Sequence, residues 1–398
     1  DHLAGGSGND LIDGQGGADH IYGDAGFNVN LAQRLEEATL GKSQVLTVVN
    51  NDSATEPTRD RLVAGKDSII GSGGDDIIFG DFGVINQTPF TQRITSVTNV
   101  EWIDSVNPTK GGDDDIQGSE GSDRILGGFG DDTINGGDGT DYILGDNGLI
   151  DYSFDSDLAT LDVVVTTERT VGGADTIRGE MDQDVLIGGP LGDRIDGGND
   201  EDLIFGDNVR LDSTTGSDTN PRYRQLSGSL IYDVGVGTGS PDQALVTEEE
   251  EAVPGGPAVW EIFEITLLNY SDEVQAAALT NFGDDYLAGG SHDDQIFGQL
   301  GNDTIQGDGS IDMPDDAAAY RDGTGLLVVN PSAEDFSGMG SDGDDYIEGN
   351  GGDDVIFGNL GQDDIIGGSS ELFSLTSEAL RPDGSDLIFG GAATDISR

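Results

Sequence analysis

The chain has 398 residues, of which 78 are acidic and 17 basic, so its formal net charge is −61. Such a charge opposes a compact fold unless bound cations neutralise it, and it disfavours nucleic acid, whose phosphates it would repel, as a partner. The chain has no cysteine, which excludes disulfides, thiol catalysis and zinc–thiolate sites. It has no run of about 18 apolar residues, so the sequence predicts no transmembrane segment.

A nine-residue unit repeats in groups from one end of the chain to the other. Each unit has a glycine-rich stretch at positions 1 to 4 and an aspartate at position 6. Leucine or isoleucine follows at position 8 in 20 of the 21 units, the exception being Ser397. Besides Asp1, position 6 is occupied by Asp10, Asp19, Asp67, Asp76, Asp114, Asp123, Asp132, Asp141, Asp175, Asp184, Asp193, Asp202, Asp285, Asp294, Asp303, Asp345, Asp354, Asp363, Asp386 and Asp395.

The spacing predicts one tight turn and one three-residue strand in every unit. Glycine at positions 1, 2 and 4 permits the positive φ angles of a tight loop whose carbonyls can point inward. In a triplet such as Thr133-Ile134-Asn135, the residue at position 8 points to one face and its neighbours to the other. Two units therefore form a coil of 18 residues, and stacked coils bring all position-8 side chains into one core.

Stacked turns place the position-6 carboxylates about 4.8 Å apart from coil to coil if strand pairing sets the rise. Unpaired carboxylates at that spacing repel one another, and a hard divalent cation resolves the repulsion. Ca²⁺ accepts a large set of carboxylate and carbonyl oxygens in flexible geometry, whereas Mg²⁺ requires a rigid octahedron and keeps its waters. The sequence therefore predicts multiple calcium ions, with the twenty aspartates from Asp10 to Asp395 as candidate ligands.

The unit resembles the glycine-rich nonapeptide G-G-x-G-x-D-x-U-x of the RTX (repeats-in-toxin) proteins, and residues 127–135 match every fixed position. The resemblance covers roughly half of the chain, scattered over its whole length. It implies an all-β fold, a parallel β-roll (a right-handed β-solenoid), with calcium between adjacent turns. It also implies a bacterial protein that folds outside the cell after export through a type I secretion channel.

Six insertions interrupt the predicted roll, which we expect to be one continuous fragment over residues 1–398. They lie at about residues 27–64, 84–110, 149–171, 209–282, 310–339 and 369–383. Five groups of repeats end in Gly-Asp, as at Gly145-Asp146, where a turn begins but the unit's own position-6 aspartate is missing. We expect the chain to leave the roll there, into β-rich segments with strand candidates at residues 100–103, 161–165 and 260–265. The chain opens on the tail of a unit, so more of the repeat is expected before it.

Position 9, which points out of the roll, is apolar in many units. Its apolar residues include Phe79, Leu126, Leu144, Ile187, Phe205, Phe297, Phe357, Ile366 and Phe389. A water-exposed row of such side chains would form a sizeable apolar patch. We therefore expect the insertions to fold back over this row, or else a second copy of the chain to cover it.

No motif in the sequence indicates catalysis. The chain lacks a G-x-S-x-G elbow, an H-E-x-x-H helix, a Walker loop and an EF-hand loop. Its three histidines, His2, His20 and His292, have no neighbours that suggest a triad, and we expect them at the surface. We therefore expect that the chain is not an enzyme.

These features favour a calcium-dependent extracellular structural segment of an adhesin, surface-layer or filament protein of a bacterium. The alternative is the calcium-binding folding and secretion module of a type I-secreted enzyme or toxin whose active domain lies outside this segment. A third hypothesis gives the insertions a carbohydrate-binding role, with Trp102 or Trp260 as the stacking platform. The expected partners are calcium ions and, in an assembly, further copies of the chain or a cell surface.

Overall fold

The computed structural model describes residues 1–28, 63–87, 100–155, 157–213, 258–270, 282–332, 343–361 and 363–394. Strands dominate these residues, which contain no α-helix and one 3-10 turn, η1 (Glu378–Leu380). No helix that could span a membrane occurs in this part of the chain.

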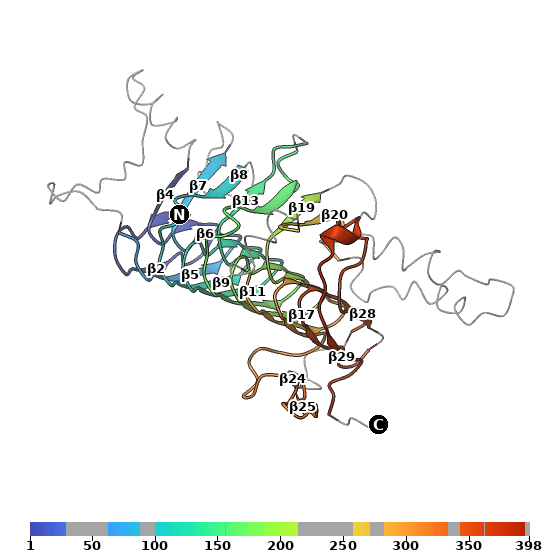
Figure 1. Cartoon of the computed structure of the whole chain (residues 1–398). Coiled ribbons are helices and arrows are strands. Elements are labelled where there is room, and N and C mark those ends of the chain that lie inside the picture. The colour runs from blue at the N-terminus through green and yellow to red at the C-terminus, as the bar shows by residue number, and fades with distance from the viewer. Residues whose placement is uncertain are drawn as a thin grey trace, which may run out of the picture.

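Two long parallel sheets face each other and form the elongated roll that crosses Figure 1. Sheet A contains, in spatial order, β1 (His2–Ala4), β3 (His20–Tyr22), β6 (Ile77–Phe79), β10 (Arg124–Leu126), β12 (Tyr142–Leu144), β16 (Val185–Ile187), β18 (Leu203–Phe205), β22 (Gln295–Leu300), β26 (Tyr346–Gly351) and β28 (Asp364–Ile366). Sheet B contains β2 (Leu11–Asp13), β5 (Ser68–Gly73), β9 (Asp115–Glu120), β11 (Thr133–Asp138), β15 (Thr176–Met181), β17 (Arg194–Asn199), β21 (Tyr286–Ser291), β23 (Thr304–Gln306), β27 (Val355–Phe357) and β29 (Leu387–Phe389). Because successive roll strands alternate between the sheets, each coil contributes one strand to each. The predicted all-β parallel roll is confirmed.

Neighbouring strands of each sheet pair in register, so that equivalent positions of successive coils stack. Ile134 of β11 lies opposite Ile116 of β9 on one side and Ile177 of β15 on the other. The side chains at position 8 fill the space between sheets A and B. This buried row comprises Ile12, Ile21, Ile69, Ile78, Ile116, Ile125, Ile134, Ile143, Ile177, Leu186, Ile195, Ile204, Leu287, Ile296, Ile305, Ile347 and Ile356. The predicted position-8 core is therefore confirmed.

The turns owe their shape to residues in the left-handed region. In most uninterrupted turns positions 2 and 4 have positive φ, as at Gly128 (115°) and Gly130 (141°). Non-glycine residues at position 4 adopt the same conformation with φ between 58° and 83°, as found for Asp182, Leu191, Asp200, His292 and Ala393. These departures from the glycine pattern therefore keep the turn, at a cost in backbone strain.

Glycine at position 1 has a different cause from the one that the sequence suggests. Gly127 is not in the left-handed region. A Cβ on Gly127 would stand 2.1 Å from the carbonyl oxygen of Gly145 and 2.5 Å from Oδ2 of Asp132. Our expectation of positive φ at position 1 is wrong here, since the glycine is required by the close approach of two oxygen atoms.

Four of the insertions build a third sheet, sheet C, beside the roll (Figure 1). Its strands, in spatial order, are β20 (Phe263–Leu267), β19 (Val209–Ser213), β14 (Val163–Thr166), β13 (Gly148–Asp151), β8 (Val100–Ser105), β7 (Phe82–Gln87) and β4 (Ala25–Asn28). The pair β4–β7 is parallel and the remaining pairs are antiparallel. Segments far apart in the sequence thus form one continuous sheet.

Sheet C covers the outer face of sheet A and buries its apolar position-9 row. The position-9 side chains Phe79, Leu126, Leu144, Ile187, Phe205 and Phe297 belong to one buried cluster with Ile85, Ile103, Ile150, Val164, Leu211 and Phe263 of sheet C. Within the row, Phe205 and Phe297 stack with ring centroids 5.1 Å apart. The prediction that the insertions fold back over position 9 is confirmed on this face.

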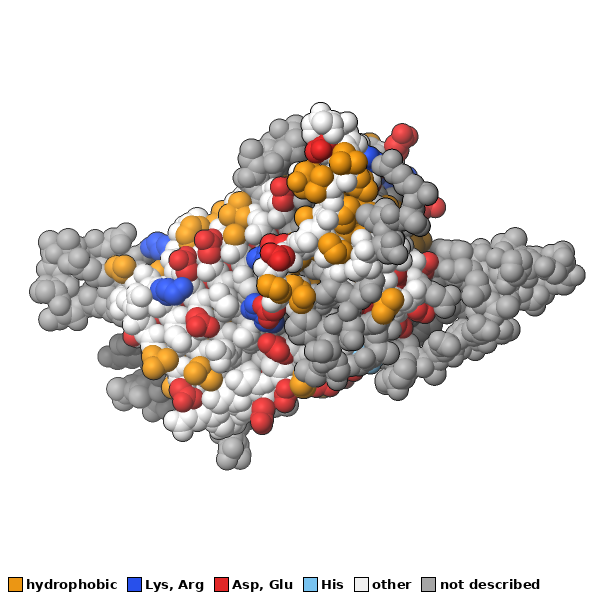
Figure 2. Space-filling view, turned by 90° about the horizontal axis from the view of Figure 1, so that it is seen from below, with side chains coloured by type: hydrophobic (Ala, Val, Ile, Leu, Met, Phe, Trp, Pro, Cys, Tyr) orange, Lys and Arg blue, Asp and Glu red, His pale blue; other side chains and the backbone are white. Residues whose placement is uncertain are grey.

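In the described part of the chain, one segment covers the outer face of sheet B, near the end of the roll. The fifth insertion contains the hairpin of β24 (Ala318–Arg321) and β25 (Leu327–Asn330), which lies below the roll in Figure 1. It packs Ile311, Ala317 and Ala319 with Ala288 and Phe357 of sheet B. Elsewhere on this face position 9 is mostly polar, and acidic side chains are spread over the surface seen in Figure 2, where basic ones are few.

Two ion pairs hold the fifth insertion against sheet B. Arg178 pairs with Asp312 at 2.5 Å, and Arg194 pairs with Asp316 at 2.9 Å. Asp196, between these arginines in the sequence, accepts hydrogen bonds from Oγ of Ser310 at 2.6 Å and from the amide of Ile311 at 3.0 Å.

Candidate metal sites

The position-6 aspartates lie in the turns that precede the strands and form one ladder along each edge of the roll. The ladder that leads into sheet B contains Asp10, Asp67, Asp114, Asp132, Asp175, Asp193, Asp285, Asp303, Asp354 and Asp386. The ladder that leads into sheet A contains Asp1, Asp19, Asp76, Asp123, Asp141, Asp184, Asp202, Asp294, Asp345 and Asp363. Sixteen of the predicted ligands are only 0–2% exposed, and Asp10, Asp363 and Asp386 are half-buried. Asp395 lies outside the described residues.

One carboxylate oxygen of each ladder aspartate from Asp67 to Asp386 accepts a hydrogen bond from the preceding coil. The amide of Asp114 donates to Oδ1 of Asp132 at 2.7 Å, and the amide of Asp132 donates to Oδ1 of Asp175 at 2.8 Å. The bond recurs along both ladders, from Asp10 to Asp386, at 2.7–3.3 Å. It fixes the carboxylate so that its other oxygen, Oδ2, faces the position-1 glycine of the turn.

This second oxygen has no hydrogen-bond donor within the described part of the chain. The atoms without a donor are Oδ2 of Asp10, Asp19, Asp67, Asp76, Asp114, Asp123, Asp132, Asp141, Asp175, Asp184, Asp193, Asp202, Asp285, Asp303 and Asp354. A carbonyl oxygen of the next coil approaches the same glycine: a Cβ on Gly118 would stand 2.3 Å from Oδ2 of Asp123 and 2.5 Å from the oxygen of Gly136. Two oxygen atoms, one of them charged, thus converge with no hydrogen between them, and a bound cation stabilises such an arrangement.

The donor set fits calcium. Among the described residues, no group of three or more histidine, aspartate or glutamate side chains is placed to hold a metal ion. A cation between two turns would therefore complete its coordination with backbone carbonyls. Ca²⁺ accepts such a mixed set of oxygens, whereas Zn²⁺ favours nitrogen and sulfur. The assignment of the individual aspartates as ligands stays a prediction.

Burial dominates the electrostatics of both ladders. It raises the pKa of Asp76 and Asp132 from the ordinary value of 3.8 to about 7, and that of Asp141 to about 8. Repulsion by neighbouring aspartates adds to the effect, as Asp123 does for Asp141. The pKa is raised well above 3.8 for Asp175, Asp184, Asp193, Asp202, Asp285, Asp294 and Asp303. The ionised ladder therefore requires positive charge close to it.

Comparison with known proteins agrees with this geometry. The family model of the RTX calcium-binding nonapeptide repeat (4 copies) matches residues 1–29, 63–84, 109–148, 172–191, 279–313 and 339–370. The chain therefore carries RTX calcium-binding nonapeptide repeats along its length. RTX nonapeptide repeats bind multiple Ca²⁺ ions. The matched segments omit Asp193 and Asp202, yet both continue the RTX ladder, since the amide of Asp193 donates to Oδ1 of Asp285 at 2.8 Å and that of Asp202 to Oδ1 of Asp294 at 2.8 Å. No curated protein matches the chain.

Each insertion interrupts a turn of the RTX roll, but the turn keeps a position-6 aspartate, which lies after the insertion in the sequence. A Cβ on Gly145 would stand 2.2 Å from Oδ2 of Asp175, which lies beyond the third insertion. The same closure joins Gly23 to Asp67, Gly80 to Asp114, Gly206 to Asp285, Gly307 to Asp345 and Gly367 to Asp386. Our expectation that these units lack their own position-6 aspartate is wrong, because the aspartate after each insertion completes the turn before it.

A second aspartate, at position 2, links the point where the chain leaves the roll to the point where it returns. We call these two points together the neck of the insertion. Oδ1 of Asp146 accepts a hydrogen bond from the amide of Gly173 at 2.9 Å, and Oδ1 of Asp81 accepts one from Gly112 at 3.0 Å. Oδ2 of Asp81 also accepts from the amide of Phe129 in the next coil at 2.7 Å. None of the five neck aspartates, Asp24, Asp81, Asp146, Asp207 and Asp308, has the positive φ of an uninterrupted position 2, and the chain leaves the roll there. The Gly-Asp pairs in the sequence indicated where the chain leaves the roll, but not that the aspartate accepts a hydrogen bond from the residue where the chain returns.

Two expectations about side-chain exposure are wrong. His20 is 1% exposed rather than at the surface, and burial lowers its pKa to about 3. Trp260 is 0% exposed and its Nε1 donates to the carbonyl oxygen of Glu201 at 2.9 Å, so it cannot stack on a sugar. Trp102 is half-buried in β8 and stays a candidate platform.

Proposed function

We propose that this RTX roll is a calcium-dependent structural segment that works outside a bacterial cell, in an adhesin, a surface layer or a filament. The observation that carries the proposal is the continuity of the two aspartate ladders. They run from Asp10 to Asp386, and the inter-coil hydrogen bond is kept across every insertion. Because each cation would join two coils, calcium would stiffen the roll along its whole length.

The packing of the insertions supports a structural role. Large side chains such as Trp260 and Phe263 are used to bury the apolar face of sheet A. The described strands of four insertions form one sheet rather than separate modules. We accordingly propose that this segment has no catalytic activity of its own.

The repeat family and calcium chemistry both support a location outside the cell. RTX repeat proteins are typically secreted by bacteria. Extracellular calcium modules work with dissociation constants of about 10⁻⁴–10⁻³ M. A roll whose carboxylates repel one another without calcium would stay unfolded until it reached such a medium, which suits export through a type I channel.

A second candidate function is a calcium-binding folding and secretion module of an enzyme or toxin. The family match supports this candidate equally, because the repeat is the same in both. The neighbouring parts of the full protein would separate the two: further repeat-rich segments support the structural role, whereas an adjoining protease, lipase or pore-forming domain contradicts it.

Electron microscopy of the purified chain tests the structural proposal directly. In about 1–10 mM CaCl₂ we expect elongated particles that associate into ordered fibres or lattices, and excess EGTA should disperse them. Isolated particles at every calcium and protein concentration would contradict the assembly role, while leaving calcium-dependent folding intact.

A further inference from the structure

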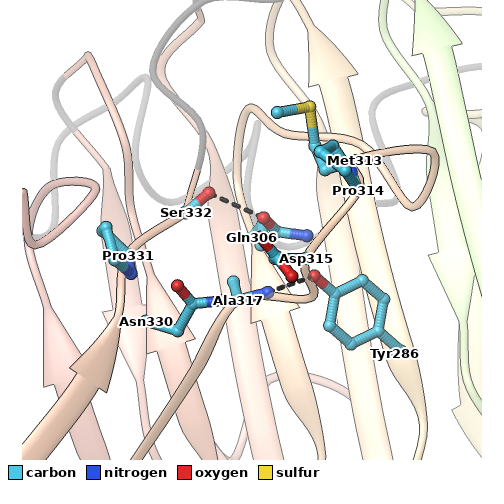
Figure 3. A pocket seen from close by; sticks show the side chains of 9 residues that line it. All are labelled: Tyr286, Gln306, Met313, Pro314, Asp315, Ala317, Asn330, Pro331 and Ser332. Atoms are coloured by element: carbon cyan, nitrogen blue, oxygen red, sulfur yellow. Dashed lines mark hydrogen bonds between the residues drawn. The ribbon is translucent and has the colours of Figure 1, made fainter.

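The fifth insertion and the outer face of sheet B line a cavity that is partly open to solvent. Its volume is about 230 Å³, and it lies beside the hairpin β24–β25 (Figure 3). Its walls are formed by Tyr286, Gln306, Met313, Pro314, Asp315, Ala317, Asn330, Pro331 and Ser332. Since drug-sized ligands fill about 300–1,000 Å³, a molecule of the size of one sugar ring fits this space.

Gln306 presents an unsatisfied donor to the cavity. The side chain is 1% exposed, and its Oε1 accepts a hydrogen bond from the hydroxyl of Ser332 at 2.6 Å. Its Nε2 lies near the hydroxyl of Tyr286 in Figure 3, and a hydrogen bond from Gln306 acts to lower the pKa of that hydroxyl. Nε2 has two N–H groups, and no other acceptor lies in hydrogen-bonding geometry among the described residues, so at least one N–H is left without an acceptor. A buried N–H without an acceptor is costly, so a bound molecule or an ordered water has to supply one.

Tyr286 offers a second donor. Its hydroxyl oxygen accepts a hydrogen bond from the amide of Ala317 at 2.7 Å, which leaves the hydroxyl proton for a ligand. The guanidinium of Arg194 lies over the ring, 4.5 Å from its centroid. Tyr286 therefore meets a ligand with its hydroxyl rather than by stacking.

The remaining walls define the charge and shape of the ligand. No lysine or arginine lines the cavity, and Asp315 is its one charged wall residue, so an anion is repelled. Asn330 and Asp315 at the rim supply acceptors, and Met313, Pro314 and Pro331 supply an apolar wall. Such a mixture suits a molecule whose hydroxyl groups both donate and accept and whose C–H groups are apolar.

We propose that this cavity binds a neutral pyranose ring, either a free monosaccharide or the terminal residue of a glycan. Hydroxyl oxygens of the sugar accept from Nε2 of Gln306 and from the hydroxyl of Tyr286, and sugar hydroxyls donate to the acceptors at the rim. The site is independent of the proposed function, because it needs only the folded roll and its fifth insertion.

Saturation-transfer NMR on the full calcium-loaded chain tests the proposal with the methyl α-glycosides of glucose, galactose and mannose at about 10 mM each. We expect transfer to at least one of them, with a dissociation constant in the millimolar range. Gln306→Glu keeps the acceptor for Ser332 but removes the donor, and should weaken binding about tenfold or more. Tyr320→Phe is the matched control, since Tyr320 lies on the same hairpin, 57% exposed and outside the cavity, and binding should be unchanged.

Three outcomes would overturn the proposal: no transfer to any of the three glycosides, equal binding by Gln306→Glu, or tighter binding of glucuronate than of the neutral sugars. Circular dichroism in calcium checks that each variant folds. If Gln306→Glu does not fold, Tyr286→Phe, which removes the hydroxyl donor, takes its place with the same expectation. A glycan array then separates the two sources, since a terminal residue is retained on the array whereas a free monosaccharide binds only in solution.

Discussion

Asp175 completes a turn that begins at Gly145, although the third insertion lies between them. Oδ2 of Asp175 is 2.2 Å from the place of a Cβ on Gly145, and in the uninterrupted turn Oδ2 of Asp132 is 2.5 Å from the corresponding place on Gly127. The carboxylate that faces the candidate metal site is therefore placed in the same way with or without an insertion. Insertions can vary in length because they leave and return between positions 2 and 4 of the turn.

Removing the third insertion should preserve the calcium sites and expose an apolar face. Replacing residues 146–172 by Gly-Asn would restore an uninterrupted turn between Gly145 and Gly173. We expect the number of bound calcium ions to stay unchanged, because Asp175 keeps its place. Loss of β13 and β14 should uncover Leu144 and raise the fluorescence of an added hydrophobic dye. A loss of bound calcium would contradict this account of the interrupted turns.

Asp132→Asn should reduce the number of bound calcium ions by up to two, because the carboxylate faces turns on both sides. Asparagine can still accept the hydrogen bond from Asp114, so the change acts mainly on charge. Equilibrium dialysis followed by elemental analysis measures the stoichiometry. Asp138→Asn is the control, since Asp138 is an exposed residue at the end of β11, the strand that follows Asp132, and it should bind calcium as the unchanged chain does. Equal stoichiometry in both variants would remove Asp132 from the ligand set.

Gly127→Ala should destabilise the calcium-loaded roll by about 1–3 kcal/mol, the usual cost of overpacking a tight site. The new Cβ would meet the carbonyl oxygen of Gly145 and the carboxylate of Asp132. Gly16→Ala is the matched control, because nothing lies within 4 Å of a Cβ at Gly16. Thermal unfolding in calcium should show a lower Tm for the first variant alone. Equal Tm values would mean that the turn can open at position 1.

The raised carboxyl pKa values predict that the calcium-free chain folds better in acid. Burial holds the pKa of Asp132 at about 7 and that of Asp141 at about 8 in the folded state, against 3.8 ordinarily. Between about pH 4 and pH 8, these carboxyl groups bind more protons in the folded state than in the unfolded state. The stability of the folded state therefore falls as the pH rises through this range. In excess chelator the β signal in circular dichroism should be stronger at about pH 4.5 than at pH 8. The reverse order would show that the carboxylates are not buried without metal.

Much of the roll could be predicted because its contacts repeat every coil. The period of the aspartates and of residues such as Ile134 predicted the turns, the core and the two carboxylate ladders. The sequence did not predict that Asp175 completes the turn that begins at Gly145. An interruption of the nine-residue period indicates a missing aspartate, although the aspartate only follows later in the chain. Only the distance between the two oxygen atoms and the glycine shows that the turn is complete.

Sheet C could not be predicted in detail because its pairings do not repeat. Ile103 pairs with Ile150, and Val164 pairs with Leu211, between segments of unrelated sequence. The apolar position-9 row indicated that something covers the roll. Six of the position-9 side chains that the sequence singles out, from Phe79 to Phe297, face sheet C, whereas Phe357 faces the fifth insertion. This difference depends on which sheet each strand joins.

Circular dichroism during a calcium titration tests whether calcium binding drives the folding of this RTX roll. The chain at about pH 7.5 would be taken from excess EGTA to about 10 mM CaCl₂. Each site held at about 100 times its Kd adds about 2.7 kcal/mol to the folded state, so many sites together should produce a steep, cooperative transition. We predict an unfolded spectrum in EGTA and a full β spectrum in calcium. A full β spectrum that persists in EGTA at this pH would contradict it.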